Sequence, residues 1–168
     1  MTILKIFLLL IVISSISAKT VSENATETAT CPQGWRDLSS VDNLGCVLFV
    51  KQQLTWDEAA AECWKQEESH LVSVATDYQR EYLGQTLYLE DLAHHPWWVG
   101  ATDRNREGRW TWSHDCGEVG EFGWRQAEPG GGIVENCAVQ SGIECEWSDL
   151  DCNGNMFGDL PIYAICQI

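Results

Sequence analysis

The sequence lacks the motifs on which catalysis and nucleotide binding commonly depend. It contains no HExxH helix, no phosphate-binding loop, no dinucleotide fingerprint and no recognisable nucleophile motif. His94 and His95 are adjacent, and neighbouring side chains seldom point the same way. A transition metal would need a third ligand, and none follows nearby. We therefore expect a protein that is not an enzyme.

Basic residues are also scarce. The 168 residues include 10 Lys and Arg against 25 Asp and Glu, which gives a formal net charge of −15. A polyanion repels nucleic acids and anionic membranes, so neither is an expected partner. The acidic composition favours a role linked to cations, or else it forms an ordinary solvated surface.

A long apolar run is missing as well. The one candidate, Ile6–Ile13, is shorter than the roughly 20 residues that a transmembrane helix needs. It follows Lys5 and precedes small residues that end at Ala18, which is the pattern of a secretory signal peptide. We expect residues 1–18 to be a signal peptide and the mature protein to be soluble, secreted and extracellular, without membrane insertion. An uncleaved anchor is the alternative.

Residues 19–30 are polar and show no periodicity, so they predict a flexible leader. This leader contains Asn24-Ala25-Thr26, an acceptor sequence for N-glycosylation. Residues 31–168 remain for one domain with a core of its own.

That domain contains all eight cysteines and is rich in tryptophan. An even number of cysteines in an exported chain predicts a disulfide framework. Eight cysteines allow 105 pairings, so spacing alone does not select one. A local bridge between Cys31 and Cys46 is the economical choice, because these two residues bracket a predicted hairpin over 31–50.

Two helices are predicted from their capping boxes. Thr55 with Glu58 begins the first helix, and Thr76 to Gln79 repeats the pattern for the second. Helical spacing places one set of side chains on an inward face of each helix. These are Ala59, Ala60, Cys63 and Trp64 in the first helix, and Tyr82, Leu83 and Leu87 in the second.

The remainder of the chain reads as short strands joined by long, glycine-rich loops, which in a compact domain are usually functional. The strand over 109–113 alternates so that Trp110 and Trp112 share a face. The other predicted strands are 46–50, 97–101, 122–124, 137–139 and 162–166.

The stretch from Ala127 to Cys152 is dense in carboxylates and cysteines. It contains Glu128, Glu135 and Asp149, together with a proline followed by three glycines. Such a loop suits a hard cation such as Ca²⁺, which takes about six to eight oxygen ligands.

An ordered set of motifs carries a family resemblance. After two helices come Trp98-Val99-Gly100-Ala101, an alternating tryptophan strand, Glu128-Pro129-Gly130, Glu135-Asn136-Cys137, Trp147-Ser148-Asp149 with Cys152, and a last strand with Cys166; Cys31 to Trp35 is similar to the family's opening. Residues 31–166 thus resemble a long-form C-type lectin-like domain of the secreted, single-domain invertebrate type. The resemblance implies an α+β fold in which two helices pack on small antiparallel sheets, with a long loop region and disulfide links.

The resemblance also implies three disulfides, Cys31–Cys46, Cys63–Cys166 and Cys137–Cys152. Cys116 and Cys145 fall outside this framework. We predict that they pair with each other; the alternative is two free or intermolecular thiols.

In family members that bind sugar, the long loop holds a Ca²⁺ that two sugar hydroxyls coordinate. By position, Glu128, Glu135, Ser148 and Asp149 correspond to the metal ligands. Glu128, Gly130, Glu135 and Asp149 correspond to the residues that contact the carbohydrate. Gly130 and Ser148 replace two asparagines, which removes amide groups that would bind the ion and the sugar. We therefore name no monosaccharide.

Further features follow from the same resemblance. Pro129 is similar to the family's cis-proline, although an isolated proline is more often trans. Asp103, Glu107 and Asn136 match a second cation site that some members have. The alternative is a solvated loop whose acids face Arg104 and Arg106.

Two functions are compatible with these residues. The first is Ca²⁺-assisted recognition of glycans or glycoproteins, for example sugars on microbial surfaces in innate immunity. The second is a lectin-like module that binds a protein ligand and uses neither calcium nor sugar, since fold alone does not determine function.

Overall fold

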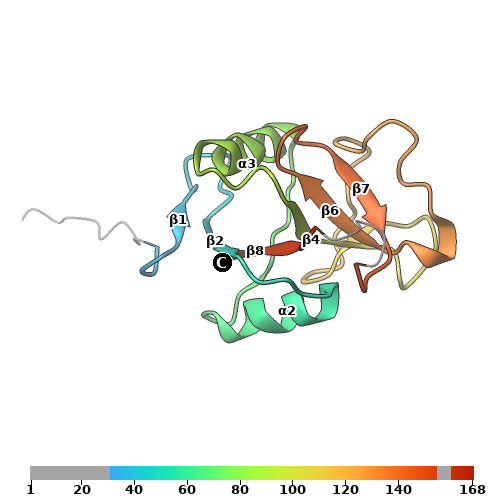
Figure 1. Cartoon of the computed structure of the whole chain (residues 1–168), viewed down its shortest axis with the longest axis horizontal. Coiled ribbons are helices and arrows are strands. Elements are labelled where there is room, and N and C mark those ends of the chain that lie inside the picture. The colour runs from blue at the N-terminus through green and yellow to red at the C-terminus, as the bar shows by residue number, and fades with distance from the viewer. Residues whose placement is uncertain (1–30, 155–159) are drawn as a thin grey trace, which may run out of the picture. The chain divides into compact units, whose positions relative to one another are not determined.

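The computed structural model describes residues 31–154 and 160–168, which belong to one compact unit (Figure 1). The predicted signal peptide (1–18), leader (19–30) and glycosylation acceptor Asn24 lie outside these residues. The helices are α2 (Trp56–Lys65), α3 (Asp77–Leu89) and the 3-10 helix η1 (Gly132–Val134). The strands are β1 (Arg36–Asp37), β2 (Cys46–Val50), β3 (His70–Leu71), β4 (Pro96–Thr102), β5 (Thr111–Trp112), β6 (Cys137–Ser141), β7 (Trp147–Leu150) and β8 (Tyr163–Gln167).

Both helices begin where their capping boxes predict. The Thr55 hydroxyl accepts the Glu58 backbone N–H, and the Glu58 carboxylate accepts the Thr55 backbone N–H at 2.9 Å. Thr76 and Gln79 exchange the same two hydrogen bonds at the start of α3. Each pair satisfies two backbone donors that a helix leaves without intrahelical partners.

The strands form one branched sheet of eight strands, in the order β1-β2-β8-β4-β6-β7, with β3 on β8 and β5 on β4. The pairing is antiparallel except between β4 and β8, which run parallel. The small antiparallel sheets expected from the resemblance are thus joined through β4 and β8. Figure 1 shows α3 and α2 on opposite sides of these central strands.

The alternation of side chains along β4 explains why every residue of this strand is buried. Trp97 and Val99 face a core that also contains Leu83 and Leu87 of α3. Trp98 faces the other way, into a core with α2 and β8. A strand covered on both faces is apolar throughout, because neither face meets solvent.

The inward face of α2 is narrower than predicted. Ala59 and Cys63 are fully buried, but the Trp64 side chain is 63% exposed, so its predicted inward position is wrong. Trp64 directly follows Cys63, and one residue turns a helix by about 100°. Cys63 is held toward the core by its disulfide with Cys166 on β8, and Trp64 therefore points to solvent.

Two of the predicted strands, 109–113 and 122–124, are shorter than expected. Only Thr111–Trp112 is a strand in the first, and Trp110 and Trp112 are both buried in the same core. The segment 122–124 makes one isolated bridge, from Trp124 to Trp147, in place of the predicted strand. This segment packs on the core through Trp124, whose ring lies edge to face with that of Trp110. The two ring centroids are 4.7 Å apart.

Three of the four predicted disulfides are present: Cys31–Cys46, Cys63–Cys166 and Cys137–Cys152. The fourth prediction is wrong, because Cys116 and Cys145 are both free. Cys145 packs against Gly84 of α3, whereas Cys116 is exposed at the turn after β5 and lines a hollow with arginines. A disulfide requires two facing sulfurs with Cα atoms within about 7 Å, and these cysteines face different neighbours.

Candidate functional site

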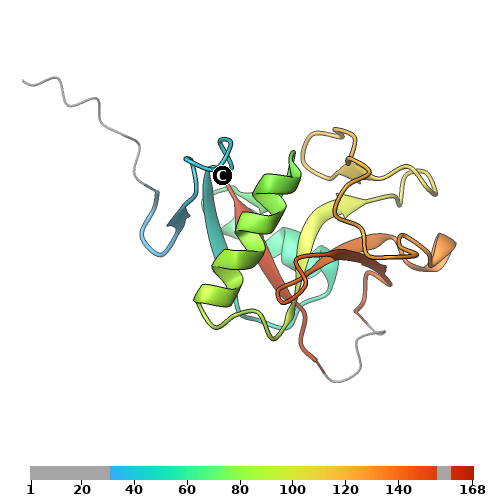
Figure 2. The ribbon, with the colours of Figure 1, turned by 90° about the horizontal axis from the view of Figure 1, so that it is seen from above.

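Two loop segments and one strand contribute the acids of the candidate site. Glu128 precedes Pro129 in the loop before η1, Glu135 follows η1, and Asp149 lies on β7. The Glu128–Pro129 peptide bond is cis. The yellow and orange segments that contain these loops lie at the same end of the domain in Figures 1 and 2. The fold therefore gathers the carboxylates that the sequence singled out.

The Asp149 carboxylate is fixed by hydrogen bonds to the backbone. It is buried, and its carboxylate accepts the backbone N–H of Gly130 at 2.9 and 3.1 Å and that of Gly131 at 3.0 Å. Two consecutive N–H groups that point at one anion resemble the backbone nests that bind anions in other proteins. The glycine at position 130 thus contributes its backbone, although it has no side chain to contribute.

The pKa of Glu128 is raised strongly by its neighbours in the site. A hydrogen bond with Asp149 raises the pKa of Glu128 to about 7, and burial and the charges of Asp149 and Glu135 add to this shift. Two carboxylates that share one hydrogen bond cannot both ionise cheaply. The pair therefore holds a proton near neutral pH, which a cation would displace.

The Glu135 side chain lies close to Gly131 and is the third acid of the group. A Cβ built on Gly131 would lie within van der Waals overlap of the Glu135 carboxylate, so only glycine allows this approach. Burial raises the pKa of Glu135, and the charges of Asp149 and Asp151 raise it further. These shifts mean that the acids repel one another across a short distance.

The residues proposed for a second cation site are only partly gathered. Asp103 is 3% exposed, its Oδ2 accepts the Gly108 N–H at 2.8 Å, and its Oδ1 has no hydrogen-bond partner among the described residues. Burial raises its pKa, with a further contribution from Asp149. Glu107 is exposed, and the Asn136 amide donates to the Ile133 carbonyl at 2.9 Å. Asp103 therefore lies within electrostatic reach of Asp149.

The alternative for this loop was that its acids face Arg104 and Arg106 in solvent. The contacts of Arg104 show that this alternative is also only partly correct. It forms a bidentate ion pair with Asp57 of α2, with N–O distances of 2.6 and 3.1 Å, and lies over the Trp56 ring. It does not neutralise the acids of its own loop.

Ser148 is placed away from the other predicted ligands. It alternates with Asp149 on β7, and successive strand residues point to opposite faces. Its side chain lines a separate hollow with Arg125, Glu146 and Leu160. The predicted contribution of Ser148 to the metal is thus not visible in this arrangement.

The chemistry of the donor set fits a hard cation, although the geometry is not preassembled. Glu128, Glu135 and Asp149 supply anionic oxygens, and their mutual repulsion is what a divalent ion would relieve. In the part of the chain that the structure describes, no three His, Cys, Asp or Glu side chains already surround one point. Ion binding would therefore require these carboxylates to rearrange, and the Glu128–Asp149 hydrogen bond would have to open.

A wide hollow adjoins these acids and was missed by the sequence reasoning. It measures 590 Å³, and Glu128 and Pro129 form part of its wall. The other residues that line it include Arg109, Trp110, Glu118 and Trp124. The alternating tryptophans are the signal that could have indicated it, since Trp110 lines this hollow.

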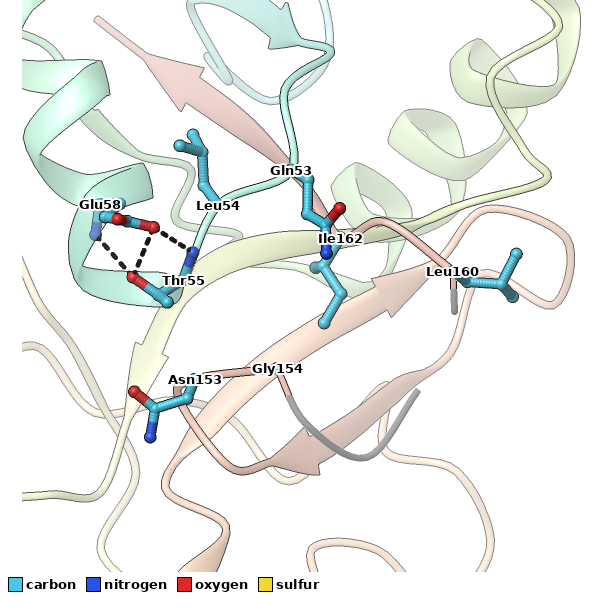
Figure 3. A pocket seen from close by; sticks show the side chains of 8 residues that line it. All are labelled: Gln53, Leu54, Thr55, Glu58, Asn153, Gly154, Leu160 and Ile162. Carbon is cyan, nitrogen blue, oxygen red and sulfur yellow. Dashed lines mark hydrogen bonds between the residues drawn. The ribbon is translucent and has the colours of Figure 1, made fainter. Parts of the chain in front are cut away.

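A second hollow, of 240 Å³, lies between the start of α2 and the segment after β7 (Figure 3). Thr55 and Glu58 line it, and both are already committed to the capping box. Its polar groups stabilise the helix end, so we do not assign it a ligand.

Comparisons with known proteins agree with this architecture. The family model described as "Lectin C-type domain" matches residues 52–166. A perlucin-like protein of Mytilus galloprovincialis is 25% identical over 138 residues, which covers 82% of this chain and 85% of that protein. A CD209 antigen-like protein C of Mus musculus is 30% identical over 140 residues, with coverage of 82% and 68%.

Solved structures with this fold differ in their relation to calcium. A calcium-independent type II antifreeze protein superposes with a TM-score of 0.64 at 23% identity, covering 82% of this chain and 92% of that one. A Ca²⁺-dependent type II antifreeze protein, determined in its Ca²⁺-free form, superposes with a TM-score of 0.65 at 25% identity, covering 81% of this chain and 98% of that one. The comparisons thus agree with the family and the fold of the chain.

Proposed function

Because this chain belongs to the C-type lectin domain family, we propose that it binds carbohydrate with the help of Ca²⁺ held by Glu128, Glu135 and Asp149. The family is a non-enzymatic one whose members include carbohydrate-binding lectins. The observation that carries the proposal is the convergence of these three acids, with the pKa of Glu128 raised to about 7 by its hydrogen bond with Asp149. Such a group is unfavourable when it is fully ionised and becomes favourable around a cation.

Each residue has a separate role in this proposal. Asp149 is held rigid by the Gly130 and Gly131 N–H groups and would supply a fixed anionic oxygen. Glu128 and Glu135 would close on the ion from the loop segments before and after η1. When bound, the ion would offer open coordination positions to two neighbouring sugar hydroxyls. The Glu128 and Glu135 carboxylates would accept hydrogen bonds from the same hydroxyls.

The hollow beside Glu128 would accept the remainder of a glycan. Trp110 and Trp124 line it, and the apolar surface that they offer would suit the C–H faces of sugar rings. Because Gly130 and Ser148 replace two amides, we expect weak binding at each site, so that multivalent presentation would be needed for useful avidity.

Calcium-dependent melting tests the ion. Since an ion that binds only the folded state must raise the melting temperature, we expect millimolar CaCl₂ to raise the Tm of the purified, oxidised chain relative to EDTA. The variants Glu128→Gln and Glu135→Gln should lose this rise, whereas Glu67→Gln, in the exposed turn after α2, should keep it. An equal rise in all four proteins would place the ion elsewhere.

A glycan array with and without EDTA tests the sugar. We expect binding that disappears on chelation and in Glu128→Gln. Binding that is insensitive to both would contradict the proposal.

One observation favours the alternative, a protein-interaction module without calcium or sugar. The Asp149 carboxylate already accepts backbone hydrogen bonds from Gly130 and Gly131. If these bonds complete the site, CaCl₂ will leave the Tm unchanged and the array will stay blank. The chain should then be examined for a protein ligand.

We also propose that the protein acts outside the cell, with residues 1–18 removed as a signal peptide and Asn24 glycosylated. The three disulfides support an oxidising compartment. No helix among the described residues has the length and apolarity to cross a bilayer. Recognition of microbial sugars in innate immunity is one use of such a protein. N-terminal sequencing and glycosidase treatment of the secreted protein test the processing.

A further inference from the structure

Another hollow shares Arg109 with the one beside Glu128, and its lining residues include two arginines and no acid. It measures 340 Å³ and is lined by Asn105, Arg106, Arg109, Thr111 and Cys116. The two guanidinium groups donate hydrogen bonds, the amide and the hydroxyl are neutral, and no lining side chain is a carboxylate. Local positive charge on a chain of net charge −15 marks a place where an anion is favoured.

The loop between β4 and β5 holds the two arginines in place. The Arg106 N–H donates to the Asp103 carbonyl and the Arg109 N–H donates to the Arg106 carbonyl, both at 2.9 Å. The buried Asp103 carboxylate also accepts the Gly108 N–H. The backbone that presents both guanidinium groups is therefore ordered by internal hydrogen bonds.

Arg106 is the uncommitted arginine of this loop. Arg104 is paired with Asp57, and Arg109 is paired with Glu118 at 3.0 Å. Among the residues that the structure describes, no ion pair reaches Arg106. The Arg109–Glu118 pair is exposed on both sides, at 55% and 75% of the side chains, and such pairs contribute little stability. Arg109 can therefore exchange Glu118 for a stronger anion at small cost.

Arg109 also links this hollow to the candidate carbohydrate site. It lines both the 340 Å³ hollow and the 590 Å³ hollow, whose wall includes Glu128 and Pro129. A chain of sugar rings that begins at Glu128 and follows the wall made by Trp110 would reach Arg109 next. A negatively charged substituent on that chain would then meet Arg106.

We propose that the hollow lined by Arg106 and Arg109 is a subsite for a sulfate ester or a carboxylate on an acidic glycan. Guanidinium groups bind both anions through paired, charge-assisted hydrogen bonds. The proposal rests on the proposed function, since it names the class of glycan for the same surface. Glu118 and Glu121 line the adjoining hollow and oppose polyanions, so the subsite favours one localised charge over a densely charged polymer.

A glycan array made of matched pairs tests the proposal. The members of each pair differ only by one sulfate ester or by one carboxylate, so the array also separates these two sources of charge. We expect the charged member of at least one set to bind more tightly to the wild-type chain. Arg106→Gln and Arg109→Gln should each reduce this preference by about three- to tenfold and leave neutral members unchanged.

Two further variants control for net charge. Glu118→Gln releases Arg109 and should increase the preference for charged glycans. Glu67→Gln changes the net charge equally in the turn after α2, and Arg36→Gln removes an arginine that is paired with Glu90; neither should change the preference.

The outcomes separate this inference from the proposed function. Equal binding of neutral and charged members, abolished by Glu128→Gln, would overturn the inference and leave the proposed function standing. A preference that survives in Arg106→Gln and Arg109→Gln would also overturn it. A blank array would overturn both.

Cys116 provides an independent readout of occupancy. It is exposed, carries a free thiol and lines the proposed subsite, whereas the free thiol of Cys145 lines a different hollow with Gly84 and Tyr88. A saturating charged glycan should slow iodoacetamide alkylation of Cys116 at least severalfold and leave Cys145 unchanged. Equal slowing of both thiols, or of neither, would contradict binding at this subsite.

Discussion

Gly130 illustrates how a single residue can be misjudged from its side chain alone. By its side chain, Gly130 lacks the amide that the family resemblance leads us to expect at this position. In the structure, the backbone N–H groups of Gly130 and Gly131 hold the Asp149 carboxylate. A Cβ on Gly130 would lie 2.9 Å from the Ala127 carbonyl oxygen, so the loop is shaped for glycine. The residue removes one kind of ligand and orients another.

Glu128 leads to a prediction on pH at this same scale. Its folded pKa of about 7 lies above the ordinary value of 4.5, so the folded chain binds more protons than the unfolded chain between these values. In EDTA, the free energy of unfolding should therefore fall by about 1–3 kcal/mol as the pH rises from 4.5 to 7. Burial raises the pKa of Glu135 and of Asp103 as well, which acts in the same direction.

Urea unfolding at pH 5, 6 and 7.5 measures this slope. Glu128→Gln should show a flatter profile than the wild type, and Glu67→Gln should show the wild-type profile. If the Glu128→Gln profile runs parallel to that of the wild type, the shared hydrogen bond does not carry the effect. Saturating CaCl₂ should restore stability at pH 7.5, where the acids are ionised.

At the scale of elements, α3 is held close to the turn between β6 and β7. A Cβ on Gly84 would lie 2.1 Å from the Cys145 Sγ, which no packing tolerates. The backbone of Cys145 has a φ of 56°, in the left-handed region. The sulfur thus fills the space that a glycine leaves on the helix, and the approach of α3 to this turn depends on both residues.

Gly84→Ala should destabilise the domain by about 1–3 kcal/mol in urea unfolding, because the new methyl group overlaps the sulfur. In a Cys145→Ala background the same substitution should cost less, because the sulfur is gone and only the Cβ of residue 145, 2.8 Å away, remains in the way. Equal costs in the two backgrounds would mean that the sulfur is not the obstacle.

At the scale of the whole molecule, the disulfides constrain loops of very different length. Cys63–Cys166 spans 103 residues and joins α2 to the last strand, whereas Cys31–Cys46 spans only 15. Cys63 and Cys166 are also fully buried in the core beneath α2. The long bridge therefore limits the unfolded chain far more than the local one.

Replacing Cys63 and Cys166 together by alanine should lower the free energy of unfolding by about 5 kcal/mol, against about 3 kcal/mol for the pair Cys31 and Cys46. Urea unfolding of the two double variants beside the wild type gives both values, and the local pair serves as the matched control. Equal losses would show that loop length does not govern the stabilisation.

The sequence by itself determined what depends on near neighbours in the chain. The capping boxes at Thr55 and Thr76 lie within three residues of their partners, so local chemistry was sufficient to predict where both helices begin. The density of acids over 127–152 located the candidate site. The resemblance supplied the three disulfides, two of which span only 15 residues.

Only the tertiary structure decided the features that join distant segments. It separated Cys116 from Cys145, turned Trp64 to solvent and brought Asp103 within the electrostatic reach of Asp149. It also placed Arg109 between two hollows. Spacing along the chain carries no information on such contacts, because they depend on how β4, β7 and α3 pack once the cores on both faces of the sheet have formed.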